Sequence, residues 1–168
     1  MAKPGSVKIV SNTGPIIGLA KIRQLGLLKK LASKICIPPF VYKELFGKIG
    51  PETTEIERAL GEFIKVSPIR ISDPTLEKVL AELDEGERQA ILLARSFEEE
   101  VLLLMDDYAG RKAARKVHLV VTGIIGLLLS AKEKGLIEKV SPLVDELREN
   151  GYWLSDEVIQ ISKKLAKE

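Results

Sequence analysis

The stretch Val101-Leu-Leu-Leu-Met-Asp-Asp107 decides the fold that we expect for this chain. Its first five residues form a short apolar run with no polar side, which is typical of a strand buried on both faces. The two aspartates end the run, and a helical pattern follows over 108–116. The stretch therefore predicts a strand inside a parallel sheet, joined at its carboxyl end to a helix.

The same order of strand and helix occurs twice more, at 7–11 with a helical pattern from Ile16, and at 119–121 with a helix over 124–134. A fourth strand is predicted at 34–37, while 63–71 is either an edge strand or a turn. We expect the α/β class, with a parallel central sheet of about four strands flanked by helices. Further helices are predicted at 39–46, 53–61, 74–83, 85–97, 142–149 and 156–167.

Length and composition narrow the class of protein. A chain of 168 residues, 45% hydrophobic and 30% charged, predicts a single domain over 1–168. The longest uncharged apolar stretch, 119–131, is shorter than the roughly 20 residues of a membrane helix, and residues 1–5 lack a signal-peptide core. We therefore expect a cytoplasmic protein, and the abundance of Lys and Glu suits a thermophile.

Net charge and the numbers of cysteine and histidine limit the kinds of ligand and metal site that the sequence can indicate. The formal net charge of +2 is too small to indicate a nucleic-acid partner by itself. Cys36 is the only cysteine and His118 the only histidine, which excludes a disulfide framework and a zinc site built from these residues. A metal ion in this protein must therefore be held by oxygen atoms.

Polar residues follow three of the predicted strands. Because the carboxyl ends of parallel strands meet at one edge of a sheet, Asn12, Asp106, Asp107 and Thr122 are expected close together. An alternative reading of the aspartate pair is a cap for the helix that begins at Tyr108.

Two glutamates extend this group. Glu87 lies on the apolar face of the helix over 85–97, so it needs a partner: a metal ion, hydrogen-bond donors, or a buried ion pair with Arg111 or Arg115. Glu44 follows Phe40 and Val41 by four and three residues on a predicted short helix, so it lies on the same helix face as they do. The alternative is an ordinary exposed glutamate. If these acids converge near Asn12, they form an oxygen-lined cleft of the kind that holds Mg²⁺ or Mn²⁺. Two such ions can activate water for phosphodiester cleavage, so the expected substrate is nucleic acid.

Five blocks of the sequence, at 10–22, 37–45, 86–94, 105–113 and 122–132, occur in an order that covers most of the chain. Together they resemble the PIN-domain-like proteins of the DUF3368 type, in the VapC-like ribonuclease superfamily. The resemblance implies a PIN-like three-layer fold and a Mg²⁺- or Mn²⁺-dependent ribonuclease acting on RNA. It also implies kinship with toxins of toxin–antitoxin pairs, hence an antitoxin protein as partner, and a homodimer.

The resemblance also implies roles for particular residues. The metal ligands and catalytic positions are Asn12, Glu44, Glu87 and Asp106, with Asp107 beside them as a further catalytic residue. The residues expected to support the site or contact substrate are Thr13, Arg111 and Thr122.

Asn12 departs from the pattern of the family, because nuclease-active PIN domains usually carry aspartate there. An amide oxygen can ligate a hard cation but adds no charge, so metal affinity should fall. The expected enzyme is therefore an endoribonuclease with a weakened site, and the alternative is a degenerate module that binds RNA or a protein partner.

The basic residues, the aromatic pair near the C-terminus and the single cysteine also have expected roles. Two groups of basic residues follow predicted strands: lysines and arginines at 21, 23, 29 and 30, after the first strand, and those on the helix over 108–116. They either hold phosphates or form solvated helix faces. Tyr152 and Trp153 are expected to anchor the C-terminal helix to the core rather than to stack on bases. Cys36 is expected in the core.

Overall fold

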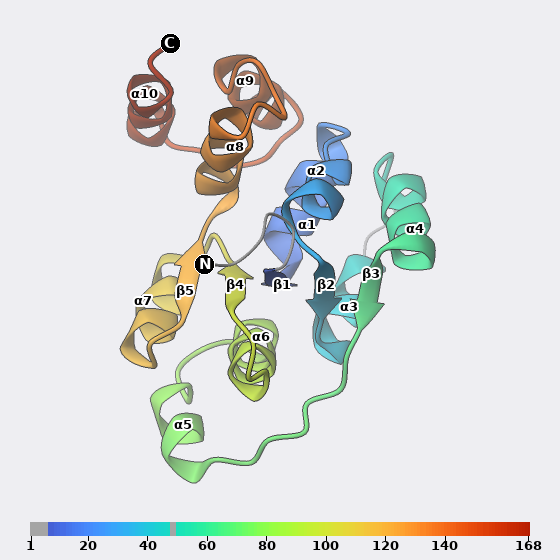
Figure 1. The fold of residues 1–168 in the computed structure, drawn as a ribbon, viewed down its shortest axis with the longest axis vertical. Helices are drawn as coiled ribbons and strands as arrows, with labels where there is room; N and C mark the ends of the chain where they lie inside the picture. The colour runs from blue at the N-terminus through green and yellow to red at the C-terminus, as the bar shows by residue number, and fades with distance from the viewer. Residues whose placement is uncertain (1–6, 48–49) are drawn as a thin grey trace.

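The computed structural model describes residues 7–47 and 50–168. Within these residues, five parallel strands form one sheet in the order β3-β2-β1-β4-β5 (Figure 1). The strands are β1 (Lys8–Ser11), β2 (Lys34–Ile37), β3 (Ile64–Val66), β4 (Val101–Leu104) and β5 (Val120–Thr122). The predicted α/β class is confirmed. The sheet has one strand more than the four expected, because the segment left open at 63–71 forms the edge strand β3.

Helices connect and cover the strands. Those of the described chain are α1 (Thr13–Lys21), α2 (Gly26–Leu31), α3 (Pro39–Leu45), α4 (Thr53–Glu62), α5 (Pro74–Val79), α6 (Glu85–Ser96), α7 (Tyr108–Lys116), α8 (Ile124–Glu133), α9 (Ser141–Glu149) and α10 (Asp156–Leu165). The sequence pattern does not predict α2, because six residues are too few to display a helical period. The helix predicted over 74–83 ends earlier, at Val79.

Alternating side chains of the strands build a core on each face of the sheet. On one face, Ile9 and Leu104 join buried residues of α1, α8 and α9. On the other face, Val10, Cys36 and Leu103 pack with residues of α5, α6 and α7. Cys36 is fully buried, which confirms its place in the core. The sheet thus forms the middle layer of three, as Figure 1 shows.

Backbone hydrogen bonds continue beyond the strand ends and align the carboxyl edge of the sheet. The Asn12 N–H donates to the Leu104 carbonyl at 2.9 Å, and the Met105 N–H donates to the Thr122 carbonyl at 2.9 Å. Because these bonds hold β1, β4 and β5 in register, the residues that follow each strand emerge at one edge of the sheet.

In the part of the chain that the structure describes, no helix is long and apolar enough to cross a bilayer. The expected lack of a signal-peptide core concerns residues 1–5, which lie outside the described residues.

Candidate active site

Asn12 stands between β1 and α1. It occupies the N-cap position of α1, with extended backbone angles, but its side chain accepts no capping hydrogen bond. The preceding Ser11 is buried and donates its hydroxyl hydrogen to the Asn12 carbonyl at 2.9 Å. The carboxamide of Asn12 is therefore not used for helix capping, the usual role of asparagine at this position.

Three side-chain oxygens surround Gly86, in the first turn of α6. Measured from the place that a Cβ would take at Gly86, Glu44 Oε1 lies at 2.6 Å, Asn12 Oδ1 at 3.3 Å and Asp84 Oδ1 at 3.6 Å. We call this group of two carboxylates and one amide, Asn12, Glu44 and Asp84, the cradle. A side chain at residue 86 would displace the Glu44 carboxylate from its present position.

Glu44 is exposed, as the alternative reading held, yet its side chain is directed to the cradle. The Thr13 hydroxyl donates to Glu44 Oε1 at 2.8 Å. This bond ties α3 to the start of α1.

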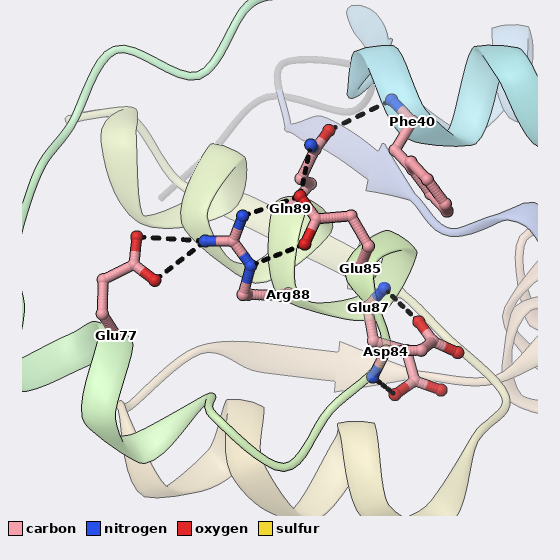
Figure 2. Close-up of polar contacts among 7 residues, drawn as sticks. All are labelled: Phe40, Glu77, Asp84, Glu85, Glu87, Arg88 and Gln89. Atoms are coloured by element: carbon pink, nitrogen blue, oxygen red, sulfur yellow. Dashed lines mark hydrogen bonds and ion pairs between the residues drawn. The ribbon is translucent and has the colours of Figure 1, made fainter.

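Glu87 lies at the N-terminus of α6 and is only 8% exposed. It forms a capping box with Asp84: the Glu87 N–H donates to Asp84 Oδ1 at 2.8 Å, and the Asp84 N–H donates to Glu87 Oε2 at 3.4 Å (Figure 2). Burial, followed by the negative charges of Asp84 and Asp107, raises the pKa of Glu87 to about 7. Among the described residues Glu87 has no ion pair with an arginine, so the alternative partner Arg111 or Arg115 is not found.

Asp106 follows β4 and binds donors from the last third of the chain. Its Oδ1 accepts a hydrogen bond from the Ile124 N–H at 2.8 Å, and its Oδ2 accepts one from the Tyr152 hydroxyl. Burial raises the pKa of Asp106, partly offset by the Ile124 N–H and by the positive charge of Arg111. Asp106 is thus held rigidly at the sheet edge, with a cation close to it.

Arg111 lies close to Asp106. Arg111 Nη1 and Asp106 Oδ1 lie 3.0 Å and 2.5 Å from the place of a Cβ on Gly123. The Nε of Arg111 is buried and has no hydrogen-bond partner among the described residues. Arg111 therefore lowers the pKa of the half-buried Asp106, and its Nε–H remains without an acceptor in the described structure.

The remaining predicted residues have mainly local partners. Asp107 is the N-cap of α7 and accepts a hydrogen bond from the Gly110 N–H at 2.8 Å, as the capping alternative predicted for the pair. It remains exposed, and its charge acts on Glu87. The Thr122 hydroxyl donates to the Gly123 carbonyl at 3.4 Å, so it supports the turn into α8.

A polar network fixes α6 against α3 and α5 (Figure 2). The Phe40 N–H, in the first turn of α3, donates to Gln89 Oε1 at 3.1 Å, and Gln89 Nε2 donates to Glu85 Oε1 at 2.8 Å. Arg88 then joins Glu85 to Glu77 of α5, at 2.7 and 2.8 Å. This network sets the position of α3, which carries Glu44, relative to α6, which carries Glu87.

A cavity of about 620 Å³ opens beside the aspartate pair. Charged residues Asp106, Asp107 and Arg111 line one part of it, and Tyr108, Tyr152 and Trp153 contribute aromatic side chains. We call this cavity the aromatic pocket. Trp153 is 83% exposed, so the expectation that it anchors the C-terminal helix is wrong. Its neighbour Tyr152 does pack against the core, and its hydroxyl reaches Asp106.

The donor types suit a hard divalent cation, although the acids do not form one tight cluster. Among the described residues no three Asp, Glu, His or Cys side chains gather closely enough to hold a metal ion. The cradle combines two carboxylates with an amide oxygen, and Gly86 leaves room between them. Mg²⁺ usually keeps several water ligands and needs only one or two protein carboxylates, so this donor set is adequate for it.

The fold is an α/β domain in which Asn12 and Asp106 follow β1 and β4 at the carboxyl edge of the sheet, with Glu44 of α3 close to Asn12. The chain belongs to the DUF3368 family, described as a PIN domain, whose family model matches residues 8–168. PIN domains are generally ribonucleases and typically use divalent metal ions. No curated protein matches the chain.

Several site residues escaped sequence reasoning. Asp84 was missed although the spacing Asp84-x-x-Glu87 is a readable capping-box signal. No local signal links Tyr152 to Asp106, because 46 positions separate them. Of the basic residues considered, Lys21 pairs with Glu52 at 3.7 Å and Lys29 lies over the Phe63 ring, and neither lines the aromatic pocket.

Proposed function

We propose that this protein is a Mg²⁺- or Mn²⁺-dependent ribonuclease that hydrolyses RNA phosphodiester bonds. The observation that carries the proposal is the cradle: Asn12, Glu44 and Asp84 direct oxygens toward one place beside Gly86, although they come from separate parts of the chain. Membership of the PIN-domain family supports the same reaction class.

Asn12 and Glu44 would hold the cation together with Asp84, and we assign Glu87 and Asp106 to the same site as its further acids. A divalent cation supplies the positive charge that lets an acidic cleft accept an RNA phosphate, and it makes a nearby water more acidic. Because Asn12 is neutral, the site carries one formal charge fewer than it would with aspartate, which favours weaker metal binding.

The chain's own residues have separate tasks in this proposal. Glu87, with a pKa of about 7, can hold or release a proton near neutral pH. Asp106 is fixed by Ile124 and Tyr152, so its carboxylate needs no reorganisation when substrate arrives. Arg111 offers positive charge next to Asp106, where a phosphate oxygen of the substrate would lie.

The test is cleavage of single-stranded RNA by purified protein with Mn²⁺, Mg²⁺ or EDTA. We expect cleavage with either cation and none with EDTA. Glu44→Gln and Asp106→Asn should each lower the rate by about a hundredfold or more, since each removes a charge that acts on the cation. Glu133→Gln changes an exposed glutamate of α8 and should cleave like the wild type. Equal cleavage by Glu44→Gln would exclude the cradle as the reaction centre.

A second candidate is a degenerate PIN-fold module that binds RNA or a protein partner without cutting. Two points favour it: residue 12 is an uncharged asparagine where the resemblance to active PIN domains implies aspartate, and both Asp106 oxygens already accept hydrogen bonds. RNA binding that is equally tight with EDTA, with no cleavage under any divalent cation, would favour this candidate over the nuclease.

The biological setting is also part of the proposal. By its kinship, the protein would act as the toxin of a toxin–antitoxin pair, bind an antitoxin protein and form a homodimer. Ile161 and Leu165, 49% and 62% exposed one helical turn apart on α10, support an apolar protein contact of this kind. Light scattering of the purified protein measures the dimer directly.

A further inference from the structure

Two aromatic side chains border the aspartate pair while remaining open to solvent. Trp153 is 83% exposed and Tyr108 is 70% exposed, and both line the aromatic pocket. They are the most exposed of the large aromatic residues in the described chain, ahead of Tyr42 at 44% and Phe46 at 36%. Their exposure is therefore concentrated at a cavity that Asp106 also lines.

Packing does not account for the exposure of Trp153. A tryptophan gains more from burial than a small side chain does, and at 83% exposure Trp153 obtains little of that gain from the fold. The preceding Tyr152 is fixed by its bond to Asp106 and by packing against α1 and α8, as its close approach to Gly18 and Ile124 indicates. The backbone at Trp153 is thus held next to the acids while its indole remains free.

The remaining lining indicates which ligand would cover the ring. Apolar side chains, among them Ile125, Leu154 and Val158, adjoin the aromatic ones, and the charged group of Asp106, Asp107 and Arg111 lies on the same cavity. A partner with only an apolar surface would leave these charges buried without solvent, which is unfavourable. A nucleotide matches the aromatic part through the flat π face of its base, and its phosphate matches Arg111. The divalent cation of the proposed function would offset the negative charges of Asp106 and Asp107.

We propose that the aromatic pocket is a nucleobase subsite, in which Trp153 stacks on a base of single-stranded RNA next to the phosphate at the acidic site. This inference rests on the proposed function, because it takes RNA as the ligand and names the residues that hold it. The cavity volume of about 620 Å³ lies within the usual range for small-molecule pockets, roughly 300–1,000 Å³, and accommodates one nucleotide. Tyr108 borders the same cavity and can contact the base or its neighbour.

The chain contains one tryptophan, so the protein carries its own probe for this subsite. With EDTA present to prevent cleavage, a short single-stranded oligouridylate should quench Trp153 fluorescence and protect the ring from acrylamide. An oligonucleotide of equal length with abasic sites keeps the phosphates but has no base to stack. It should leave both signals close to those of the free protein.

Variants separate stacking from simple attraction to phosphate. Fluorescence anisotropy of a labelled oligouridylate should show about tenfold weaker binding for Trp153→Ala, the loss expected for one stacked base. Trp153→Phe retains an aromatic face and should bind within about threefold of the wild type. Val79→Ala removes an exposed apolar side chain of α5, 43% exposed, and should bind like the wild type. Circular dichroism of each variant checks that the fold is intact.

Several results would overturn the subsite. One is unchanged Trp153 fluorescence when anisotropy shows the oligouridylate to be bound, and another is equal quenching by the abasic oligonucleotide. Emission that shifts with protein concentration in the absence of RNA would instead assign the pocket to a second copy of this chain. RNA cleavage without any effect on Trp153 rejects only the subsite, whereas base-dependent quenching without cleavage under any divalent cation rejects only the nuclease.

Discussion

At the residue scale, Glu87 is the acid whose surroundings most oppose its charge. Burial and the charges of Asp84 and Asp107 raise its pKa to about 7, compared with an ordinary value of 4.5. The folded protein therefore binds a proton at Glu87 that the unfolded chain has already released between these two pH values. The resulting penalty on folding is absent below pH 4.5, grows as the pH rises and is complete above about pH 7.

Replacing Glu87 by glutamine removes this penalty and retains the capping box, which accepts glutamine at the same position. In EDTA at about pH 8, we expect Glu87→Gln to raise the free energy of unfolding by about 1–3 kcal/mol, and at about pH 4 to leave it nearly unchanged. Guanidinium unfolding at both pH values measures the difference.

Glu133→Gln, which removes an exposed charge from α8, serves as the control and should show little change at either pH. A Glu87→Gln variant that is destabilised at about pH 8 would mean that a favourable charge interaction of Glu87 outweighs its burial and its acidic neighbours.

At the element scale, the acids can meet only if α3 and α6 keep their relative position. Gln89 provides a direct polar link, because it accepts a hydrogen bond from the Phe40 N–H at the start of α3. Among the described residues, the hydrogen bonds of the Gln89 side chain go to Phe40 and Glu85 and not to a cradle side chain. Gln89 is therefore a positioning residue. Its own position is fixed by the hydrogen bond that its side chain donates to the Glu85 carboxylate, one helical turn earlier (Figure 2).

Gln89→Ala leaves the Phe40 N–H without its partner, so we expect a loss of about 1 kcal/mol in the free energy of unfolding. Because α3 gains freedom, Mn²⁺ affinity should also fall, by about three- to tenfold, as is typical when a supporting residue is removed. Calorimetric titration with Mn²⁺ and guanidinium unfolding give the two values.

Gln160→Ala is the matched control, since Gln160 is an exposed glutamine of α10, and it should preserve Mn²⁺ affinity. If Gln89→Ala lost stability while binding Mn²⁺ as the wild type does, the link between α3 and α6 would have no role in shaping the site.

At the scale of the whole molecule, the sequence predicts what local patterns and sheet geometry determine. The apolar run before Asp106 shows a buried strand, and the rule for parallel sheets then brings Asn12 to the same edge. Glu87 is recognisable because a carboxylate interrupts an apolar helix face. Asp84 lies close by and follows from capping chemistry, although we did not predict it as part of the site.

Other features depend on contacts between distant segments and leave no local signal. The exposure of Trp153 and the bond from Tyr152 to Asp106 arise because the segment between α9 and α10 passes the ends of β4 and β5. The short strand β3 is fixed by its pairing with β2, in which Cys36 lies opposite Lys65, and three residues carry too little periodicity to identify a strand alone.

The most direct test of the account is calorimetric titration of Mn²⁺ into the wild type, Glu44→Gln and Asn12→Asp. We expect Glu44→Gln to weaken binding by about tenfold or more and Asn12→Asp to strengthen it, because affinity for a hard cation follows the charge of its oxygen ligands. Glu133→Gln should bind Mn²⁺ like the wild type. Unchanged Mn²⁺ affinity in both cradle variants would show that residues 12 and 44 do not share a cation, and it would contradict the proposed site.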